Sequence, residues 1–157
     1  MKILTYNLFL RPLFVKNKKS DYKKERLEAF KTHLGDFDIF CSQEAFVGLT
    51  SHKATLVKYG AELGFDYIVT PTLPGFFSRA LIDSGLIIMS WYPVLETDEI
   101  VFSKFLKSDA LARKGALYAK IEVSPGRHLH LFNSHTQANY FDSSFAMFRD
   151  SIALKLG

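Results

Sequence analysis

The chain has 157 residues, of which 48% are hydrophobic and 23% charged, so its composition is that of one folded domain and excludes a disordered chain. The formal net charge is +4, and a single cysteine, Cys41, excludes an internal disulfide framework. No signal-peptide h-region follows Met1 and no apolar run reaches the ~20 residues that cross a bilayer, which leaves the compartment open between the cytoplasm and a membrane surface.

The first part of the chain alternates strand and helix patterns. In order, the patterns predict a strand at 2–6, a helix at 22–34, a strand at 36–42, a helix at 50–63 and a strand at 65–69. The first strand is apolar enough to be buried on both faces, and Asn7 is expected to end it. The strand at 36–42 is expected to end at Gln43-Glu44, which places a carboxylate at a strand end.

The second part of the chain is rich in strand patterns. Residues 71–83 combine turn formers with Phe76 and Phe77, which is typical of a surface loop. Four strands that we expect to be antiparallel follow at 85–90, 94–102, 116–123 and 128–134, and a last helix is predicted at 143–156. This order predicts an α/β (α+β) layered fold on a sheet of mixed direction.

Three polar residues follow predicted strands: Asn7, Glu44 and His135. Polar side chains at the ends of buried strands can converge at one rim of a sheet, where ligands bind. Each residue has an ordinary structural alternative, since asparagine after a strand is often a turn residue, and a lone glutamate or histidine is often a surface or hydrogen-bonded structural group. Spacing alone therefore predicts a globular α/β domain.

Local sequence motifs resemble one superfamily in the right order along most of the chain. The string at 4–8 (Leu-Thr-Tyr-Asn-Leu) resembles its opening strand, and the string at 38–46 (Asp-Ile-Phe-Cys-Ser-Gln-Glu-Ala-Phe) resembles its metal-site motif. The segments 84–94, 109–117 and 132–138 are similar to its Ser-Gly-Leu, Lys-Gly and Thr-His-x-Gln-Ala motifs. These strings identify a resemblance to the endonuclease/exonuclease/phosphatase superfamily, and the Lys-Gly and Gln-Ala elements favour its neutral sphingomyelinases.

The resemblance implies a fold and roles for particular residues. The fold would be the four-layered α/β/β/α sandwich of the DNase I type. Glu44 would ligate Mg²⁺, and Asn7 would support the metal site and catalysis. His135 would bind the scissile phosphate and stabilise its developing charge. Lys114 would contact substrate, although a plain surface lysine fits its sequence context equally well.

The resemblance also implies a substrate. The activity would be Mg²⁺-dependent hydrolysis of sphingomyelin to ceramide and phosphocholine at a membrane surface, and no protein partner is implied. Phe76 and Phe77 would insert into lipid, or would cover the edge of the core. Nucleases and inositol-phosphate phosphatases of the same superfamily share the Asn, Gln-Glu and His elements, so they stay the alternative enzymes.

Residues 1–157 are expected to be an incomplete domain of this superfamily. The family finishes its site with a later Asp-x-Asn pair and a terminal Asp-His pair, and this chain has neither. We therefore expect residues 1–157 alone to be nearly inactive and poorly soluble. A non-catalytic alternative is a truncated domain that binds anionic lipid or nucleic acid through residues 11–31, which hold eight Lys and Arg against three Asp and Glu.

Overall fold

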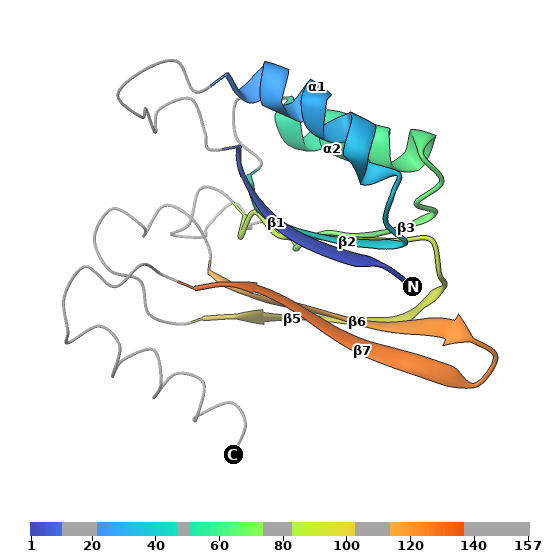
Figure 1. The fold of residues 1–157 in the computed structure, drawn as a ribbon. Helices are drawn as coiled ribbons and strands as arrows, with labels where there is room; N and C mark the ends of the chain where they lie inside the picture. The colour runs from blue at the N-terminus through green and yellow to red at the C-terminus, as the bar shows by residue number, and fades with distance from the viewer. Residues whose placement is uncertain (11–21, 47–50, 74–82, 103–113, 137–157) are drawn as a thin grey trace.

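A computed structural model describes residues 1–10, 22–46, 51–73, 83–102 and 114–136. In chain order the elements are β1 (Ile3–Leu10), α1 (Lys23–Leu34), β2 (Ile39–Ala45), α2 (His52–Glu62), β3 (Tyr67–Val69), β4 (Ile87–Ser90), β5 (Val94–Val101), β6 (Gly115–Ser124) and β7 (Arg127–His135). They form two sheets stacked face to face, with both helices on the outer face of one sheet (Figure 1). The predicted helix at 143–156, residues Phe76 and Phe77, and residues 11–21 of the basic segment lie outside the described residues.

The first sheet has four strands in the order β1-β2-β4-β3. β1 and β2 are parallel, whereas β4 is antiparallel to both β2 and β3. The predicted mixed direction is therefore confirmed. A connection through a helix is what allows β1 and β2 to run in parallel, because a tight turn would reverse the chain.

The prediction for the first strand was wrong in two respects. β1 continues past Asn7 to Leu10, which pairs with Ala45 after a shift in register. It is also an edge strand of the described sheet, so Ile3 and Tyr6 are 42% and 52% exposed rather than buried. A short apolar string fits an edge strand as well as a central one, because one face of an edge strand still packs on the core.

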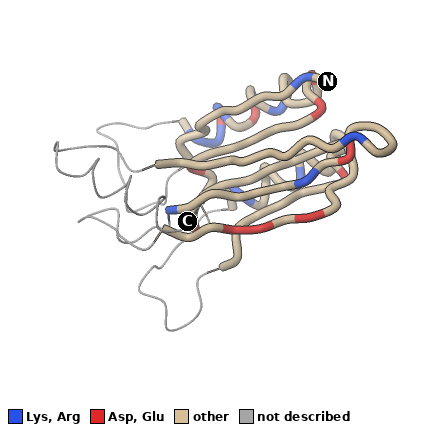
Figure 2. Tube along the Cα trace, turned by 90° about the horizontal axis from the view of Figure 1, so that it is seen from below, with Lys and Arg blue, Asp and Glu red and all other residues tan. Residues whose placement is uncertain are grey.

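The second sheet is an antiparallel meander in the order β5-β6-β7, which contains three of the four strands expected to be antiparallel. The fourth, predicted at 85–90, is β4 of the first sheet, where it is also antiparallel to its neighbours. β2 lies against β7 and β4 lies against β6. The two sheets are therefore offset by one strand, and β1 extends past β7. β5 is the edge strand of this sheet on the side away from β7, and it carries the acidic residues Glu96, Asp98 and Glu99 (Figure 2).

Two apolar clusters fill the layers on either side of the four-stranded sheet. One lies between this sheet and the helices, and includes Phe40 and Leu56. The other lies between the two sheets, and includes Ile39 and Cys41. Successive β2 residues thus point into opposite clusters, as the period of a strand requires. Among the described residues, no helix is both long enough and apolar enough to cross a membrane.

Candidate functional site

The three polar residues predicted at strand ends lie together at one rim of the sandwich. Asn7 Nδ2 donates a hydrogen bond to Glu44 Oε1 at 2.9 Å, and His135 Nε2 lies 3.4 Å from the same oxygen. The rim forms because β1 and β2 are parallel and reach the same edge, where β7 of the other sheet also ends. The structure therefore brings together Asn7 and His135, which are 37 and 91 positions away from Glu44 in the sequence.

Glu44 is the buried centre of this group. Its side chain is 7% exposed, whereas that of His135 is 26% exposed. The Glu44 backbone has a φ of 56°, in the left-handed region that residues with side chains seldom adopt. The predicted position of Glu44 at the end of its strand is nearly right, since β2 ends one residue later at Ala45.

The end of β1 is irregular beside Glu44. Phe9 also has a positive φ, at 54°, and the pairing with β2 shifts between Asn7 and Leu10. The Asn7 side chain supports this bend, because its Oδ1 accepts a hydrogen bond from the Phe9 backbone N–H at 3.0 Å. The Asn7 side chain thus bonds its own strand through Oδ1 and Glu44 through Nδ2.

A buried asparagine joins the two sheets behind the rim. Asn133 of β7 is 3% exposed, and its Nδ2 donates to the backbone carbonyls of Ser42 and Ile87 at 2.9 Å each. Its Oδ1 accepts from Gln43 Nε2 at 2.7 Å. Sequence reasoning gave Asn133 no role. The available signal was a polar side chain two residues before His135, which places both on the same, inward face of the strand.

Lys114 lies at the same edge of the second sheet. It immediately precedes Gly115, which pairs with His135, and the Lys114 carbonyl accepts a hydrogen bond from the Phe102 N–H at 2.8 Å. Lys114 is only 8% exposed, so the alternative of a plain surface lysine is wrong. Because Gly115 pairs with His135, the preceding Lys114 lies near the end of β7 that carries the imidazole.

The chemistry of the rim suits a hard divalent cation in part. Mg²⁺ is commonly held by one or two carboxylates together with water and substrate oxygens. Glu44 supplies one buried carboxylate, with an amide and an imidazole beside it. Within the described ranges, no group of three or more His, Cys, Asp or Glu side chains forms a complete metal cluster. The described rim therefore contributes one carboxylate of the kind that such a cation prefers.

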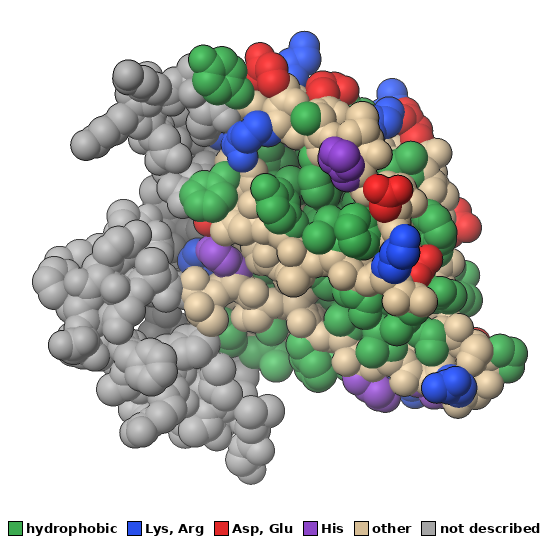
Figure 3. Space-filling view, viewed as in Figure 1, with side chains coloured by type: hydrophobic (Ala, Val, Ile, Leu, Met, Phe, Trp, Pro, Cys, Tyr) green, Lys and Arg blue, Asp and Glu red, His purple; other side chains and the backbone are tan. Residues whose placement is uncertain are grey.

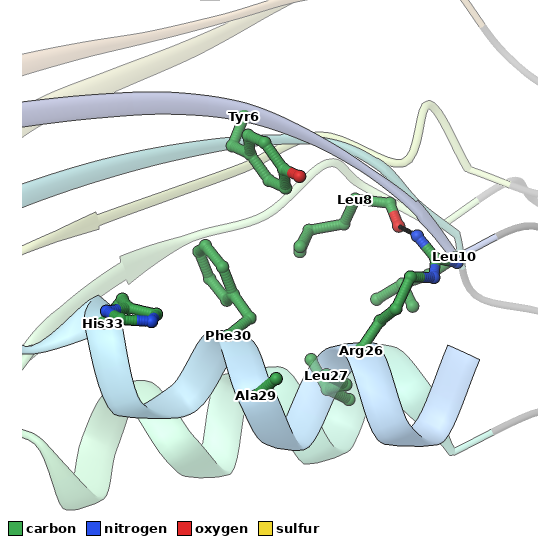
Figure 4. Close-up of a pocket in the computed structure, with 8 residues that line it drawn as sticks. All are labelled: Tyr6, Leu8, Leu10, Arg26, Leu27, Ala29, Phe30 and His33. Atoms are coloured by element: carbon green, nitrogen blue, oxygen red, sulfur yellow. Dashed lines mark hydrogen bonds between the residues drawn. The ribbon is translucent and has the colours of Figure 1, made fainter. Parts of the chain in front are cut away.

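A separate cavity of about 250 Å³ lies between β1 and α1. It is lined mainly by apolar side chains of the two elements, and Arg26 reaches across it to donate to the Leu8 carbonyl at 2.9 Å (Figure 4). A second guanidinium nitrogen of Arg26 lies 3.4 Å from the Phe9 carbonyl. Arg26 thus ties the irregular end of β1 to α1, and none of the three rim residues lines this cavity.

Comparison with curated proteins finds sphingomyelinases and phospholipases. The chain is 34% identical over 136 residues to a sphingomyelinase of Dictyostelium discoideum, covering 82% of this chain and 29% of that protein. It is 26% identical over 149 residues to phospholipase C of Staphylococcus aureus, covering 88% of this chain and 44% of that protein. The chain therefore spans less than half the length of these relatives. No protein-family model matches the sequence.

Solved structures share the fold. SmcL superposes with a TM-score of 0.73 at 24% identity, over 98% of this chain and 58% of that one. A beta toxin variant from Staphylococcus aureus, solved with bound magnesium ions, superposes with a TM-score of 0.70 at 24% identity, over 88% of this chain and 50% of that one. An endonuclease/exonuclease/phosphatase family protein from Leptotrichia buccalis gives 0.60 at 15% identity, over 87% and 54%. The chain thus has the DNase I-like fold over about half of these structures, and it belongs to the endonuclease/exonuclease/phosphatase superfamily as a neutral sphingomyelinase-like protein.

Proposed function

We propose that the complete protein is a divalent-metal-dependent phosphodiesterase that hydrolyses sphingomyelin to ceramide and phosphocholine. The observation that carries this proposal is the convergence of Asn7, Glu44 and His135 at one rim. It is supported by the curated relatives, which are named as sphingomyelinase and phospholipase C. The magnesium ions in the beta toxin structure support Mg²⁺ as the cation.

Glu44 would hold the cation through its buried carboxylate. When bound, Mg²⁺ would polarise a phosphoryl oxygen and neutralise charge that develops on the phosphate. Asn7 would help to keep Glu44 in place, because its Nδ2 donates to Oε1 and restricts rotation of the carboxylate. Asn7 was also predicted to belong to the metal site, and its amide oxygen accepts a hydrogen bond from the Phe9 N–H.

His135 would donate a hydrogen bond to a phosphate oxygen. Its side chain is more exposed than that of Glu44, which leaves the imidazole accessible to a substrate at the rim. Lys114 would add positive charge at the same edge, where it favours the binding of an anionic phosphodiester. Both groups would stabilise the negative charge that develops on the phosphate in the transition state, because donors that are already in place need no reorganisation.

Glu44→Gln in the complete protein tests this proposal. The substitution keeps the shape of the side chain and removes its charge, so Mg²⁺-dependent release of phosphocholine from sphingomyelin vesicles is expected to fall by at least about 100-fold, since even outer partners of a metal site cost 10–100-fold. Glu62→Gln is the matched control, because this carboxylate is 43% exposed on α2 and its loss should leave activity unchanged.

The same assay separates the alternatives. Preferential release of nucleotides from DNA or RNA, or of inorganic phosphate from inositol phosphates, would replace the sphingomyelin assignment with that of another enzyme of the superfamily. Full activity in Glu44→Gln would contradict the metal role of Glu44. If no substrate is cleaved while anionic vesicles bind in a salt-sensitive way that depends on residues 11–31, the non-catalytic alternative holds.

A further inference from the structure

A buried ion pair lies outside the group of rim residues. Lys53, in the first turn of α2, contacts Asp83 Oδ2 through its Nζ. The Lys53 side chain is 9% exposed and the Asp83 side chain is fully buried. Burying two charges has a large desolvation cost, and removing one partner strands the other charge. The pair therefore fixes the segment that carries Asp83 firmly against α2.

Two residues after Asp83, that segment bonds the residue that follows Glu44. Gly85 follows Asp83 and Ser84, and its carbonyl accepts a hydrogen bond from the Ala45 N–H at 2.9 Å. Gly85 has a φ of 67°, and a Cβ there would lie 2.7 Å from the Phe46 ring. Phe46 and Ala45 directly follow Glu44, so residues 83–85 pack closely against the chain at the site.

The backbone of Glu44 needs support of this kind. A left-handed conformation at a residue with a side chain is unfavourable and persists only where the surrounding structure holds it. On one side of Glu44, Asn7 of β1 bonds its carboxylate. On the other side, the Gly85 carbonyl bonds the next residue of β2, and a buried ion pair joins Asp83 of the same segment to Lys53.

We propose that Lys53 and Asp83 are positioning residues for the Glu44 carboxylate. The ion pair anchors residues 83–85 to α2, and the Gly85 carbonyl then holds Ala45 and with it the orientation of Glu44. The proposal rests on the function proposed above, in which Glu44 holds the cation. Its consequence is that a charge pair on the far side of β2 controls metal affinity without touching the metal.

The test is calorimetric titration of the complete protein with Mg²⁺ alone. Lys53→Met and Asp83→Asn should each weaken Mg²⁺ binding about tenfold, the lower end of what partners outside the ligand shell contribute. The two effects should not add in the double variant, because both remove one ion pair. Lys53→Arg keeps the charge and should retain most of the affinity. Phosphocholine release should recover at saturating Mg²⁺ in the single variants.

Lys31→Met is the matched control. It removes the same charge from the neighbouring helix, where Lys31 pairs with Glu62 at 2.7 Å on the surface, so Mg²⁺ affinity should not change. Thermal unfolding verifies that each variant is folded. If a single variant unfolds, the double variant, which strands no charge, carries the test.

Two failures have different meanings. Parental Mg²⁺ affinity in folded Lys53→Met, Asp83→Asn and double variants, with binding lost in Glu44→Gln, overturns the positioning role and leaves the proposed function standing. Parental affinity in Glu44→Gln overturns the proposed function itself, and the positioning role with it.

Discussion

Glu44 combines a strained backbone with a buried charge, and its neighbours account for both. Glu44 has a φ of 56°, and Phe9 has a φ of 54° in the part of β1 where the pairing with β2 shifts. Asn7, the last residue before this shift, donates its amide hydrogen bond to the Glu44 carboxylate, so the contact lies directly beside the irregular part of the sheet. Local strain of this kind is concentrated at functional sites.

Cys41 gives a pH-dependent prediction at the residue scale. Burial raises the pKa of its thiol from 9.0 to about 11. Well below pH 9 the thiol is protonated in both the folded and the unfolded chain, so the stability that the raised pKa contributes is fully present. Between pH 9 and 11 the unfolded chain loses this proton first, and the free energy of unfolding should fall by about 2 kcal/mol, most of the total that 1.36 kcal/mol per pKa unit gives for the full titration.

Chemical denaturation of the complete protein at several pH values measures this effect. Cys41→Ala is the control, because it removes the thiol and leaves other titrating groups such as Tyr59, whose pKa is raised to about 12, in place. The parent should lose more stability than Cys41→Ala between pH 9 and 11. Parallel pH profiles would mean that the thiol titrates alike in the folded and unfolded chains.

The sequence predicted the members of the rim better than the contacts around it. Asn7, Glu44 and His135 stand out because a polar residue after an apolar strand pattern is visible in one dimension. The Lys53–Asp83 pair is not visible, since its partners are 30 residues apart and nothing in either local pattern requires a charge. Asp83 alone is equally typical of a turn residue.

At the scale of elements, Gly115 controls how β5 meets β6. A Cβ at this position would lie 2.1 Å from the Ile100 carbonyl oxygen, which is too close for any side chain. Gly115→Ala should therefore force β5 and β6 apart and lower the free energy of unfolding by about 1–3 kcal/mol, the usual cost of overpacking. Gly115 also pairs with His135, so the end of β7 should move as well.

Urea denaturation of the complete protein, with the amide NMR signals of β7 as a second measurement, tests this prediction. Gly35→Ala is the matched control, because Gly35 has an ordinary φ of −68° and a Cβ there would meet Leu63 Cδ2 at 3.5 Å. Its stability should change by less than about 0.5 kcal/mol. Equal losses in the two variants would argue against a steric role for Gly115.

Most elements were predictable, and the errors have physical causes. The alternation of apolar residues at β6 and β7 is clear, because each strand has one face in the core and one outside. β1 was misjudged because its position at the edge depends on which strands pair, and pairing involves residues far apart in the sequence. Its extension past Asn7 depends on the register shift, which has no local sequence signal.

At the scale of the whole molecule, the offset of the two sheets exposes apolar surface. Hydrophobic side chains gather on the face between α1 and the three-stranded sheet (Figure 3). On the outer face of β7, Phe132 is 65% exposed, and its ring lies tilted against that of Tyr118 with 5.0 Å between the ring centroids. Exposed aromatic side chains and open strand edges favour association.

We therefore expect residues 1–157, expressed by themselves, to associate. Phe132→Ser should raise the fraction of soluble monomer, because it removes an exposed aromatic side chain. Leu129→Ser should lower it, because Leu129 packs against the core between the sheets. Size-exclusion chromatography with light scattering measures both. A parental chain that is monomeric and unfolds cooperatively would contradict the expectation.

The asparagine bridge behind the rim determines how the two sheets can move. One Asn133 side chain holds the backbones of β2 and β4 and the side chain of Gln43 from the opposite sheet. If one sheet slid across the other, these three hydrogen bonds would stretch together. Asn133 thus opposes shear between the sheets next to Glu44 and His135. We expect the Glu44 side and the His135 side of the rim to move together.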